Sequence, residues 1–247
     1  GGVVICVIDC VGISRADIND IRQTVIDSGK IPPLKSINIC STHTHSAIDT
    51  QGLWGKAFYS DGKNDEFMTA LKEKTADAII EAYNSRKDGK LYFGTSEADG
   101  LQTDTRTPVD FDSTITSIRF SPFDKSAGTY IINYACHAEM LGSKTNVVSA
   151  DFPSYMTKEI SEKTNGANVI FLNGAIGNLI TGSEIDSFLK GELSECIKHS
   201  KEYGKNVASL ILDIDNETVI APLINIKTET VSVLCENTAL LLARYIG

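Results

Sequence analysis

The chain opens with an unbroken apolar run, Val3–Ile8, which is typical of a strand covered on both faces of a parallel sheet. A helix is predicted next. Ser14 and Asp17 form a capping-box-like start, and apolar residues then recur at helical spacing until Gly29. Residues 35–41 are predicted as a second strand. Because strand–helix–strand crossovers join parallel strands, this opening predicts a parallel pair.

Strand and helix patterns continue to the end of the chain. Further strands are predicted over residues 90–95, 114–120, 129–136 and 167–172, with a final strand pair within 219–234. Helices are predicted over 65–86, 153–163 and 183–212, the last with a break near Gly204, and a short one from Asn237. Some pairings between residues 90 and 136 are expected to be antiparallel. The predicted fold is a layered α/β domain with mixed, largely parallel β-sheets flanked by α-helices.

Composition narrows the classes of partner. A formal net charge of −9 and a pI near 5.0 would repel a phosphate backbone, so nucleic acid is not expected as a partner. No apolar run approaches the roughly 20 residues that cross a bilayer, so no transmembrane segment is expected. The six cysteines form no C-x-x-C pair, which favours buried free thiols over a disulfide framework. Nothing in the sequence predicts an oligomeric state.

The first residues show no targeting signal, since a core strand begins almost at once. We therefore expect the natural protein to extend upstream of Gly1. Localisation stays open, although the free thiols favour a reducing compartment.

Two histidines follow the second predicted strand at positions 43 and 45. In an extended chain, side chains at i and i+2 point the same way, so the two imidazoles are predicted to converge. Imidazole is the commonest zinc ligand, and the pair could supply two ligands, or one ligand and one acid/base group. The alternative is two polar loop histidines without a shared role.

His137 also ends a predicted strand, and ligand sites gather at the carboxyl ends of strands. Three of the chain's four histidines therefore follow apolar strands, which packing alone does not explain. The fourth, His199, has charged neighbours on a predicted helix and is expected to be exposed.

Three further positions allow both a structural and a functional role. Asp151 precedes a proline-initiated helix and could be an N-cap, a zinc ligand or a group that orients a ligating imidazole. Asn173 and Gly174 open a glycine-rich turn that could be purely structural or could contact a substrate oxygen. Arg106 alone would be a surface arginine.

Taken together, five motifs resemble the neutral/alkaline ceramidase family and occur in the same order. They are Ser-Thr-His-Thr-His-Ser at 41–46, Thr-Arg-Thr-Pro at 105–108, Asn-Tyr-Ala-Cys-His-Ala at 133–138, Ser-Ala-Asp-Phe-Pro at 149–153 and Phe-Leu-Asn-Gly-Ala at 171–175. The resemblance implies that residues 1–247 form a single ceramidase-like catalytic domain, incomplete at both ends relative to the family. It also implies a secreted protein, whereas the free thiols favour a reducing compartment.

The resemblance implies specific roles. His43 and His137 would bind Zn²⁺, while His45 and Arg106 would line the substrate site. In the family, a glutamate and a tyrosine from a more C-terminal segment complete the metal shell, and no residue here is assigned to them. The family's Gly-Asp-Val-Ser-Pro turn aligns with residues 177–181, where Ile180 replaces the serine.

The predicted activity is zinc-dependent hydrolysis of an amide (N-acyl) bond in a small-molecule or lipid substrate. Zinc and Arg106 would stabilise the developing oxyanion, and His45 could pass a proton to the leaving amine. Two alternatives remain: a non-catalytic zinc- or ligand-binding module derived from the same fold, and a metal-dependent phosphoesterase or amidohydrolase. The last class generally needs more histidines and acids at strand ends than this sequence has.

Overall fold

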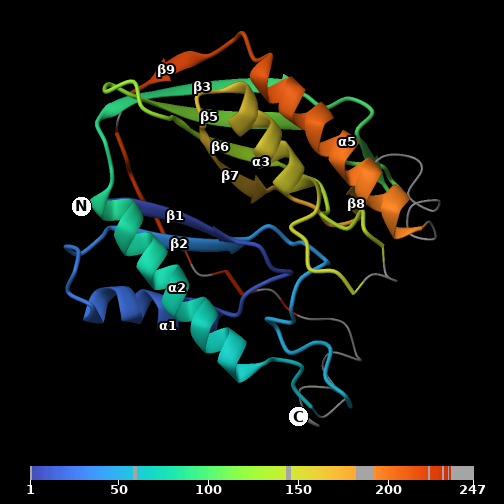
Figure 1. The fold of residues 1–247 in the computed structure, drawn as a ribbon, viewed down its shortest axis with the longest axis horizontal. Helices are drawn as coiled ribbons and strands as arrows, with labels where there is room; N and C mark the ends of the chain where they lie inside the picture. The colour runs from blue at the N-terminus through green and yellow to red at the C-terminus, as the bar shows by residue number, and fades with distance from the viewer. Residues whose placement is uncertain are drawn as a thin grey trace.

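The computed structural model describes residues 2–57, 60–142, 146–181, 192–221, 223–229, 231–232 and 234 (Figure 1). Its elements are, in order, β1 (Val3–Ile8), α1 (Arg15–Asp27), β2 (Ser36–Ser41), α2 (Asp65–Asn84), β3 (Gly89–Glu97), β4 (Gln102–Asp104), β5 (Thr114–Pro122), β6 (Thr129–Tyr134), α3 (Phe152–Lys163), β7 (Asn168–Asn173), β8 (Leu179–Thr181), α5 (Leu193–Leu212) and β9 (Thr218–Ile220). The predicted mixed α/β class is confirmed. None of the described helices is long and apolar enough to span a membrane.

The described strands form three sheets. β1 and β2 pair in parallel, as the opening pattern predicts. A five-stranded sheet has the order β7-β6-β5-β3-β9, and β4 pairs with β8. In the five-stranded sheet only β6 and β7 are parallel, whereas β3–β5, β5–β6 and β3–β9 are antiparallel.

The prediction of largely parallel sheets is therefore wrong, because most strand pairs in the five-stranded sheet are antiparallel. Each parallel pair is joined through a helix, α1 or α3, because a parallel connection must cross back over the sheet. β5 and β6 are instead joined by a short turn, which can only connect antiparallel neighbours.

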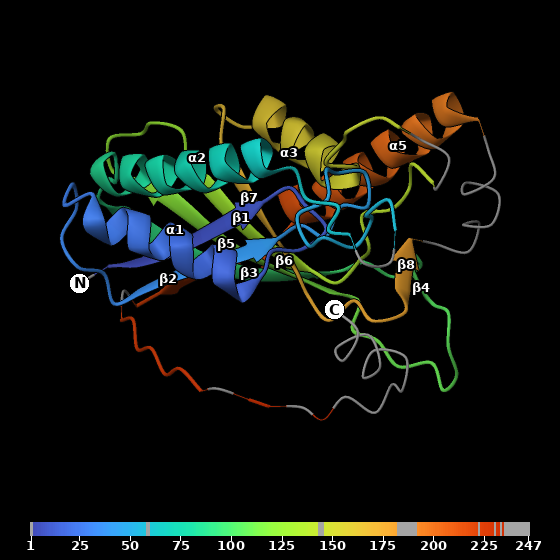
Figure 2. The same ribbon diagram turned by 90° about the horizontal axis from the view of Figure 1, so that it is seen from below.

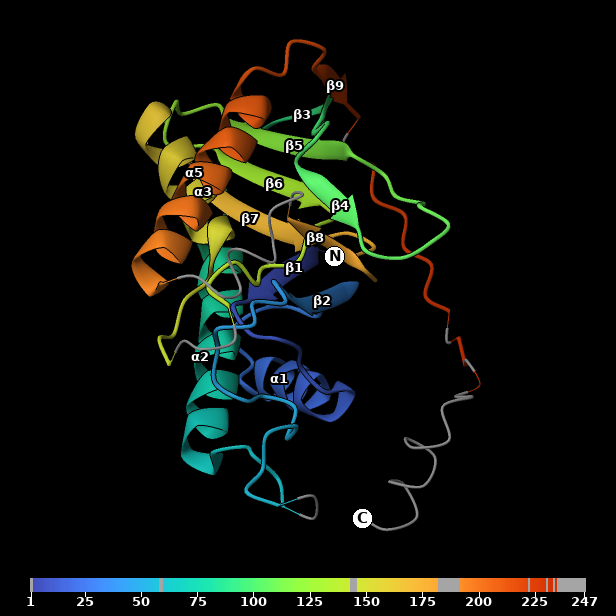
Figure 3. The same cartoon turned by 90° about the vertical axis from the view of Figure 1, so that its right-hand side faces the viewer.

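Two hydrophobic cores hold the helices against the strands. The larger core lies between the five-stranded sheet and the helices α3 and α5, and it includes Ile115, Ile132, Phe152, Phe171 and Val207. The smaller core lies between the β1–β2 pair and the helices α1 and α2, and it includes Ile8, Ile21, Ile39 and Ile79. The β1–β2 pair contacts β7, so the two cores meet along that strand (Figure 3).

Helix starts follow the predicted capping chemistry. The Ser14 hydroxyl accepts a hydrogen bond from the Asp17 amide at the start of α1, and Asn64 caps α2 in the same way.

The predicted final strand pair is wrong, since only β9 is a strand among the described residues after α5. That segment continues past β9 on the side of the strands away from α3 and α5 (Figure 2). The helix predicted from Asn237, and residues 183–191 of another, lie outside the described residues.

The predicted break near Gly204 is also wrong, because α5 continues through it. Gly204 lies where α5 packs on α3. A Cβ at Gly204 would stand 2.6 Å from the Phe152 carbonyl oxygen and 2.9 Å from the Met156 nitrogen. The glycine therefore permits close helix packing and does not end a helix.

We expect Gly204→Ala to lower the free energy of unfolding by about 1–3 kcal/mol, because the added methyl group must push α3 and α5 apart. Urea unfolding of the variant measures this. Gly177→Ala is the control, since no atom lies within 4 Å of a Cβ there. A stabilised Gly204→Ala variant would contradict the packing, because helix propensity alone favours alanine by about 1 kcal/mol.

Candidate metal site

The chain segments that follow β2 and β6 run side by side beyond the ends of their strands. Thr44 and Ala138 form a parallel bridge, and the His45 amide donates to the Ala138 carbonyl at 2.9 Å. These contacts bring the His-x-His segment next to His137. Sequence spacing could predict the convergence of the first two histidines, but the arrival of the third depends on the tertiary fold.

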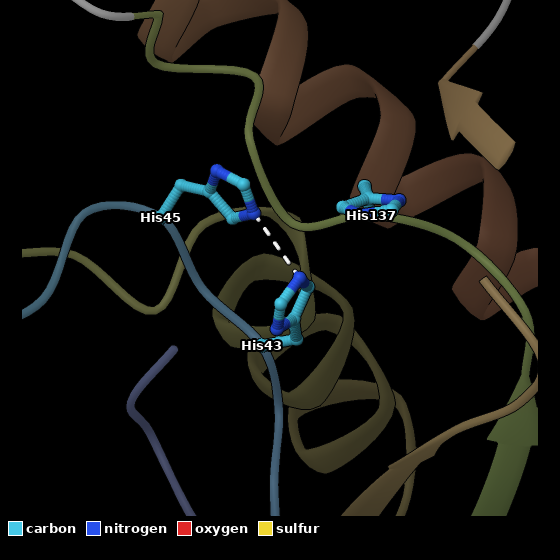
Figure 4. Close-up of side chains that lie close together, drawn as sticks. All are labelled: His43, His45 and His137. Atoms are coloured by element: carbon cyan, nitrogen blue, oxygen red, sulfur yellow. Dashed lines mark hydrogen bonds between the residues drawn. The ribbon is translucent and has the colours of Figure 1, made fainter. Parts of the chain in front are cut away.

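The three imidazoles form one group, as Figure 4 shows. Ring centroids lie 4.9 Å apart for His43 and His45, 4.9 Å for His43 and His137, and 5.5 Å for His45 and His137. One nitrogen from each ring lies within 4.8 Å of the others, which is close enough for a single metal ion to be shared. The predicted meeting of these rings is confirmed.

Two of the rings are fixed by backbone carbonyl groups. His43 Nδ1 lies 2.6 Å from the Val11 oxygen, and His137 Nδ1 lies 2.7 Å from the Leu179 oxygen. Because a carbonyl oxygen can only accept, both Nδ1 atoms must carry the hydrogen. Each neutral ring then presents the lone pair of Nε2, which is the atom that binds a metal. The donor set therefore fits a zinc ion.

His45 is held less rigidly. Its Nε2 lies 3.2 Å from Nε2 of His43, and its Nδ1 lies 3.7 Å from an oxygen of Glu139. Burial lowers the pKa of His45, Glu139 opposes that shift, and the rings of His43 and His137 add to it. The lowered pKa favours a neutral imidazole, which can act as a ligand or exchange a proton.

His43 adopts an uncommon backbone conformation, with φ of 60°. Such a left-handed conformation is costly for a residue with a Cβ, so neighbouring contacts must hold it. Residues of this kind cluster at functional sites.

Neither a protein-family model nor a curated protein matches the sequence. Two solved structures are similar: neutral ceramidase from Pseudomonas aeruginosa, with a TM-score of 0.67, and a ceramidase complexed with C2, with a TM-score of 0.66. This chain has the fold of the neutral ceramidases. Identity is 15% in both cases, and the alignments cover 85% of this chain but only 37% and 36% of the ceramidase chains.

The family resemblance of the motifs is thus supported by a shared fold over most of the chain. The chain spans little more than a third of the length of these ceramidases. At this level of identity the ceramidase likeness concerns the fold alone.

Asp151 lies outside the histidine group in this ceramidase fold. It is fully buried as the N-cap of α3, where its carboxylate accepts hydrogen bonds from the Phe152 amide at 2.6 Å and the Ser200 hydroxyl at 2.7 Å. Its second oxygen accepts from the Leu141 amide at 3.3 Å. Burial raises the pKa of Asp151, while these hydrogen bonds oppose the shift. These contacts favour the capping role among the alternatives.

The segment before Asp151 nevertheless supports the site. Thr44 Oγ1 donates to the Ser149 carbonyl at 2.7 Å, and the Ser149 amide donates to the Ser46 carbonyl at 2.7 Å. The Ser149 hydroxyl in turn accepts from the Asp151 amide at 3.0 Å. Asp151 therefore anchors a loop that is bonded directly to the His-x-His segment.

The glycine-rich turn has a clear packing role. A Cβ at Gly174 would lie 2.9 Å from the Ala135 Cβ, so the close approach of the two segments requires glycine. Asn173 at the end of β7 donates a hydrogen bond from Nδ2 to the Thr42 carbonyl. Both residues therefore contact the segments that carry the histidines, and the structural reading of the turn is supported.

Arg106 is exposed and follows β4. The loop that carries it is fixed at its base, because the Thr105 amide and hydroxyl both donate to the Asn178 carbonyl at 3.1 Å. β4 pairs with β8, whose Leu179 carbonyl fixes His137. Arg106 thus lies in the loop that leaves the small sheet supporting a predicted ligand.

Some parts of the site have no sequence signal. The carbonyl groups of Val11 and Leu179 cannot be recognised as supports without the fold, because every residue has a carbonyl. Glu139 could have been found from its i, i+2 spacing after His137, which resembles the spacing of the histidine pair. His199 is half-buried on α5, which corrects the prediction of an exposed side chain, and it lies outside the histidine group.

Proposed function

We propose that this chain is a zinc-dependent hydrolase that cleaves an amide (N-acyl) bond, in the manner of a ceramidase. The observation that carries the proposal is the pair of carbonyl-fixed rings, His43 and His137, whose Nδ1 atoms are engaged by the backbone and which group with His45 so that one nitrogen of each ring lies within 4.8 Å of the others. Their occurrence on the fold of proteins described as ceramidases favours an N-acyl lipid or a related compound as the substrate.

The donor set favours zinc among the common metals. Imidazole nitrogen suits Zn²⁺, whereas Mg²⁺ and Ca²⁺ prefer oxygen ligands. When bound, zinc would supply a water molecule whose pKa is lowered to about 7. His43 and His137 would hold the ion. The family's glutamate and tyrosine ligands are not assigned to residues of this chain.

The remaining roles fall to groups beside the ion. His45, with its lowered pKa, would be neutral at pH 7 and could hold or pass on the proton needed by the leaving amine. Arg106 would pair its permanent charge with the substrate carbonyl oxygen as negative charge develops there. Glu139 would orient the His45 ring through Nδ1.

Metal removal tests the proposal. The purified chain, loaded with zinc, should hydrolyse at least one member of a panel of N-acyl sphingosines and N-acyl amino acids. Chelation should remove both the zinc and the activity, and added zinc should restore both, because the water must be activated by the ion. Liberated amine and elemental analysis report the two quantities on the same samples.

Two results would reject the proposal. Full zinc occupancy without hydrolysis of any panel member would favour a non-catalytic zinc-binding module. That alternative is motivated by Ile180, which lies in β8 at the position of the family's serine and carries no hydroxyl. Two metal ions per chain, about 3.5–4 Å apart, would instead favour a two-metal phosphoesterase or amidohydrolase.

A further inference from the structure

The three histidines are supported by contacts at the end of β7, between the two segments that carry them. β7 ends at Asn173, which pairs in register with Tyr134 of β6. The next amide, that of Gly174, donates to the Tyr134 carbonyl at 3.2 Å. The main chain at this point is therefore fixed to the segment that leads directly to His137.

The side chain of Asn173 points to the other segment. Its Nδ2 donates a hydrogen bond to the carbonyl of Thr42, the residue immediately before His43. Thr42 is 3% exposed, and its amide donates to the Ile8 carbonyl at 3.0 Å. Thr42, the residue before the left-handed His43, is thus held at both of its peptide groups: β1 accepts from its amide, and Asn173 donates to its carbonyl.

The two ends of the Asn173 amide group differ in their contacts. Its Oδ1 is buried and has no hydrogen-bond partner among the residues that the structure describes, which carries a desolvation cost that an apolar side chain would avoid. Because Nδ2 is hydrogen-bonded and Oδ1 is not, we attribute the role of this side chain to the hydrogen bond from Nδ2. That hydrogen bond restrains the carbonyl next to a backbone conformation that is costly for a residue with a Cβ.

We propose that Asn173 is a positioning residue for the metal site: it locks the Thr42–His43 peptide so that His43 Nε2 faces the rings of His45 and His137. This inference rests on the proposed metal site and changes the role of Asn173 from a contact with substrate to a support for a ligand. No contact between Asn173 and the substrate is needed.

The test is zinc affinity, measured by competition with a chromophoric chelator. We expect Asn173→Ala to lower zinc affinity about 10- to 100-fold, the usual effect of losing an outer support of a ligand. The matched control is Asn133→Ala, because Asn133 Nδ2 also donates to a backbone carbonyl, that of Leu172 at 3.0 Å, but from an exposed position in β6. The control should bind zinc as the parent does.

A double variant separates positioning from general damage. If Asn173 acts through His43, then Asn173→Ala in a His43→Ala background should cause no further loss of zinc affinity. The visible spectrum of the Co²⁺-loaded single variants should change in the same direction, because one removes coordination by His43 and the other weakens it. Independent, additive losses in the double variant would overturn the proposal.

Asn173→Asp covers the case in which the alanine variant fails to fold. The shape is kept, but the donor facing the Thr42 carbonyl becomes an acceptor. An added negative charge near a cation site should by itself strengthen zinc binding, so weaker binding would reflect loss of the donor and repulsion of the Thr42 carbonyl that it held. Zinc binding tighter than the parent's by Asn173→Asp, which is the effect of the charge alone, would overturn the proposal.

These outcomes are distinct from failure of the proposed function. If zinc binds and no amide is hydrolysed, the effects of Asn173 on affinity can still be measured. If His43→Ala binds zinc as the parent does, the metal-site assignment itself fails. If His43→Ala loses zinc and both Asn173 variants retain it, only the positioning role is rejected.

Discussion

Replacing His43 with alanine is expected to lower zinc affinity by about 100-fold or more and to abolish zinc-dependent hydrolysis. The loss should exceed that caused by removing an outer support, which is about 10- to 100-fold, because Nε2 of His43 is itself a proposed ligand. Elemental analysis after dialysis and chelator competition measure the effect. Unchanged zinc content in the variant would reject His43 as a ligand.

The control for this experiment is His199→Ala. His199 is the one histidine of the four outside the proposed group and lies on α5. Its replacement removes an imidazole from the chain without touching the site, so zinc content should stay at the parent value. Equal zinc loss in both variants would point to non-specific binding by histidines.

Replacing Arg106 with alanine is expected to reduce kcat by about 10²- to 10³-fold while zinc content stays unchanged. The reduction is the usual effect of losing a group that stabilises an oxyanion, and Arg106 is not a proposed ligand. Steady-state kinetics on the best substrate of the panel, with zinc measured on the same preparation, provide the test. An effect confined to KM would instead assign Arg106 to ground-state binding.

Two variants control for the charge of Arg106. Arg106→Lys keeps the charge but loses the planar fork of donors, so it should recover only part of the activity. Arg86→Ala removes another exposed arginine, near the end of α2 and packed on Tyr83, and should leave kcat unchanged. A comparable loss in Arg86→Ala would mean that overall charge, and not the position of Arg106, controls the rate.

Much of the fold could be predicted from local patterns. The parallel opening followed from one apolar run, one capped helix and one crossover, and all three are local or near-local signals. β4 and β8 were missed because each has only three residues, which is too short for an alternating pattern. Gly204 misled the helix prediction, because its role is a close approach between α3 and α5 that no single segment reveals.

The site was predictable in its members but not in its supports. His43 and His45 could be paired from their spacing, and His137 could be added from its place at a strand end. Which nitrogen each ring presents depends on Val11 and Leu179, residues whose side chains give no indication of the role. The contact of Asn173 with Thr42 spans 131 positions of sequence. Only the fold could therefore distinguish a role of Asn173 in supporting His43 from a role in contacting substrate.

The meeting of the two hydrophobic cores along β7 has a thermodynamic consequence. His43 extends from the smaller core and His137 from the larger one, so one bound ion would act as a non-covalent cross-link between them. At free zinc 100 times the dissociation constant, such linkage is worth about 2.7 kcal/mol of folding free energy. The cofactor would then govern how cooperatively the two halves unfold, whether or not any substrate is present.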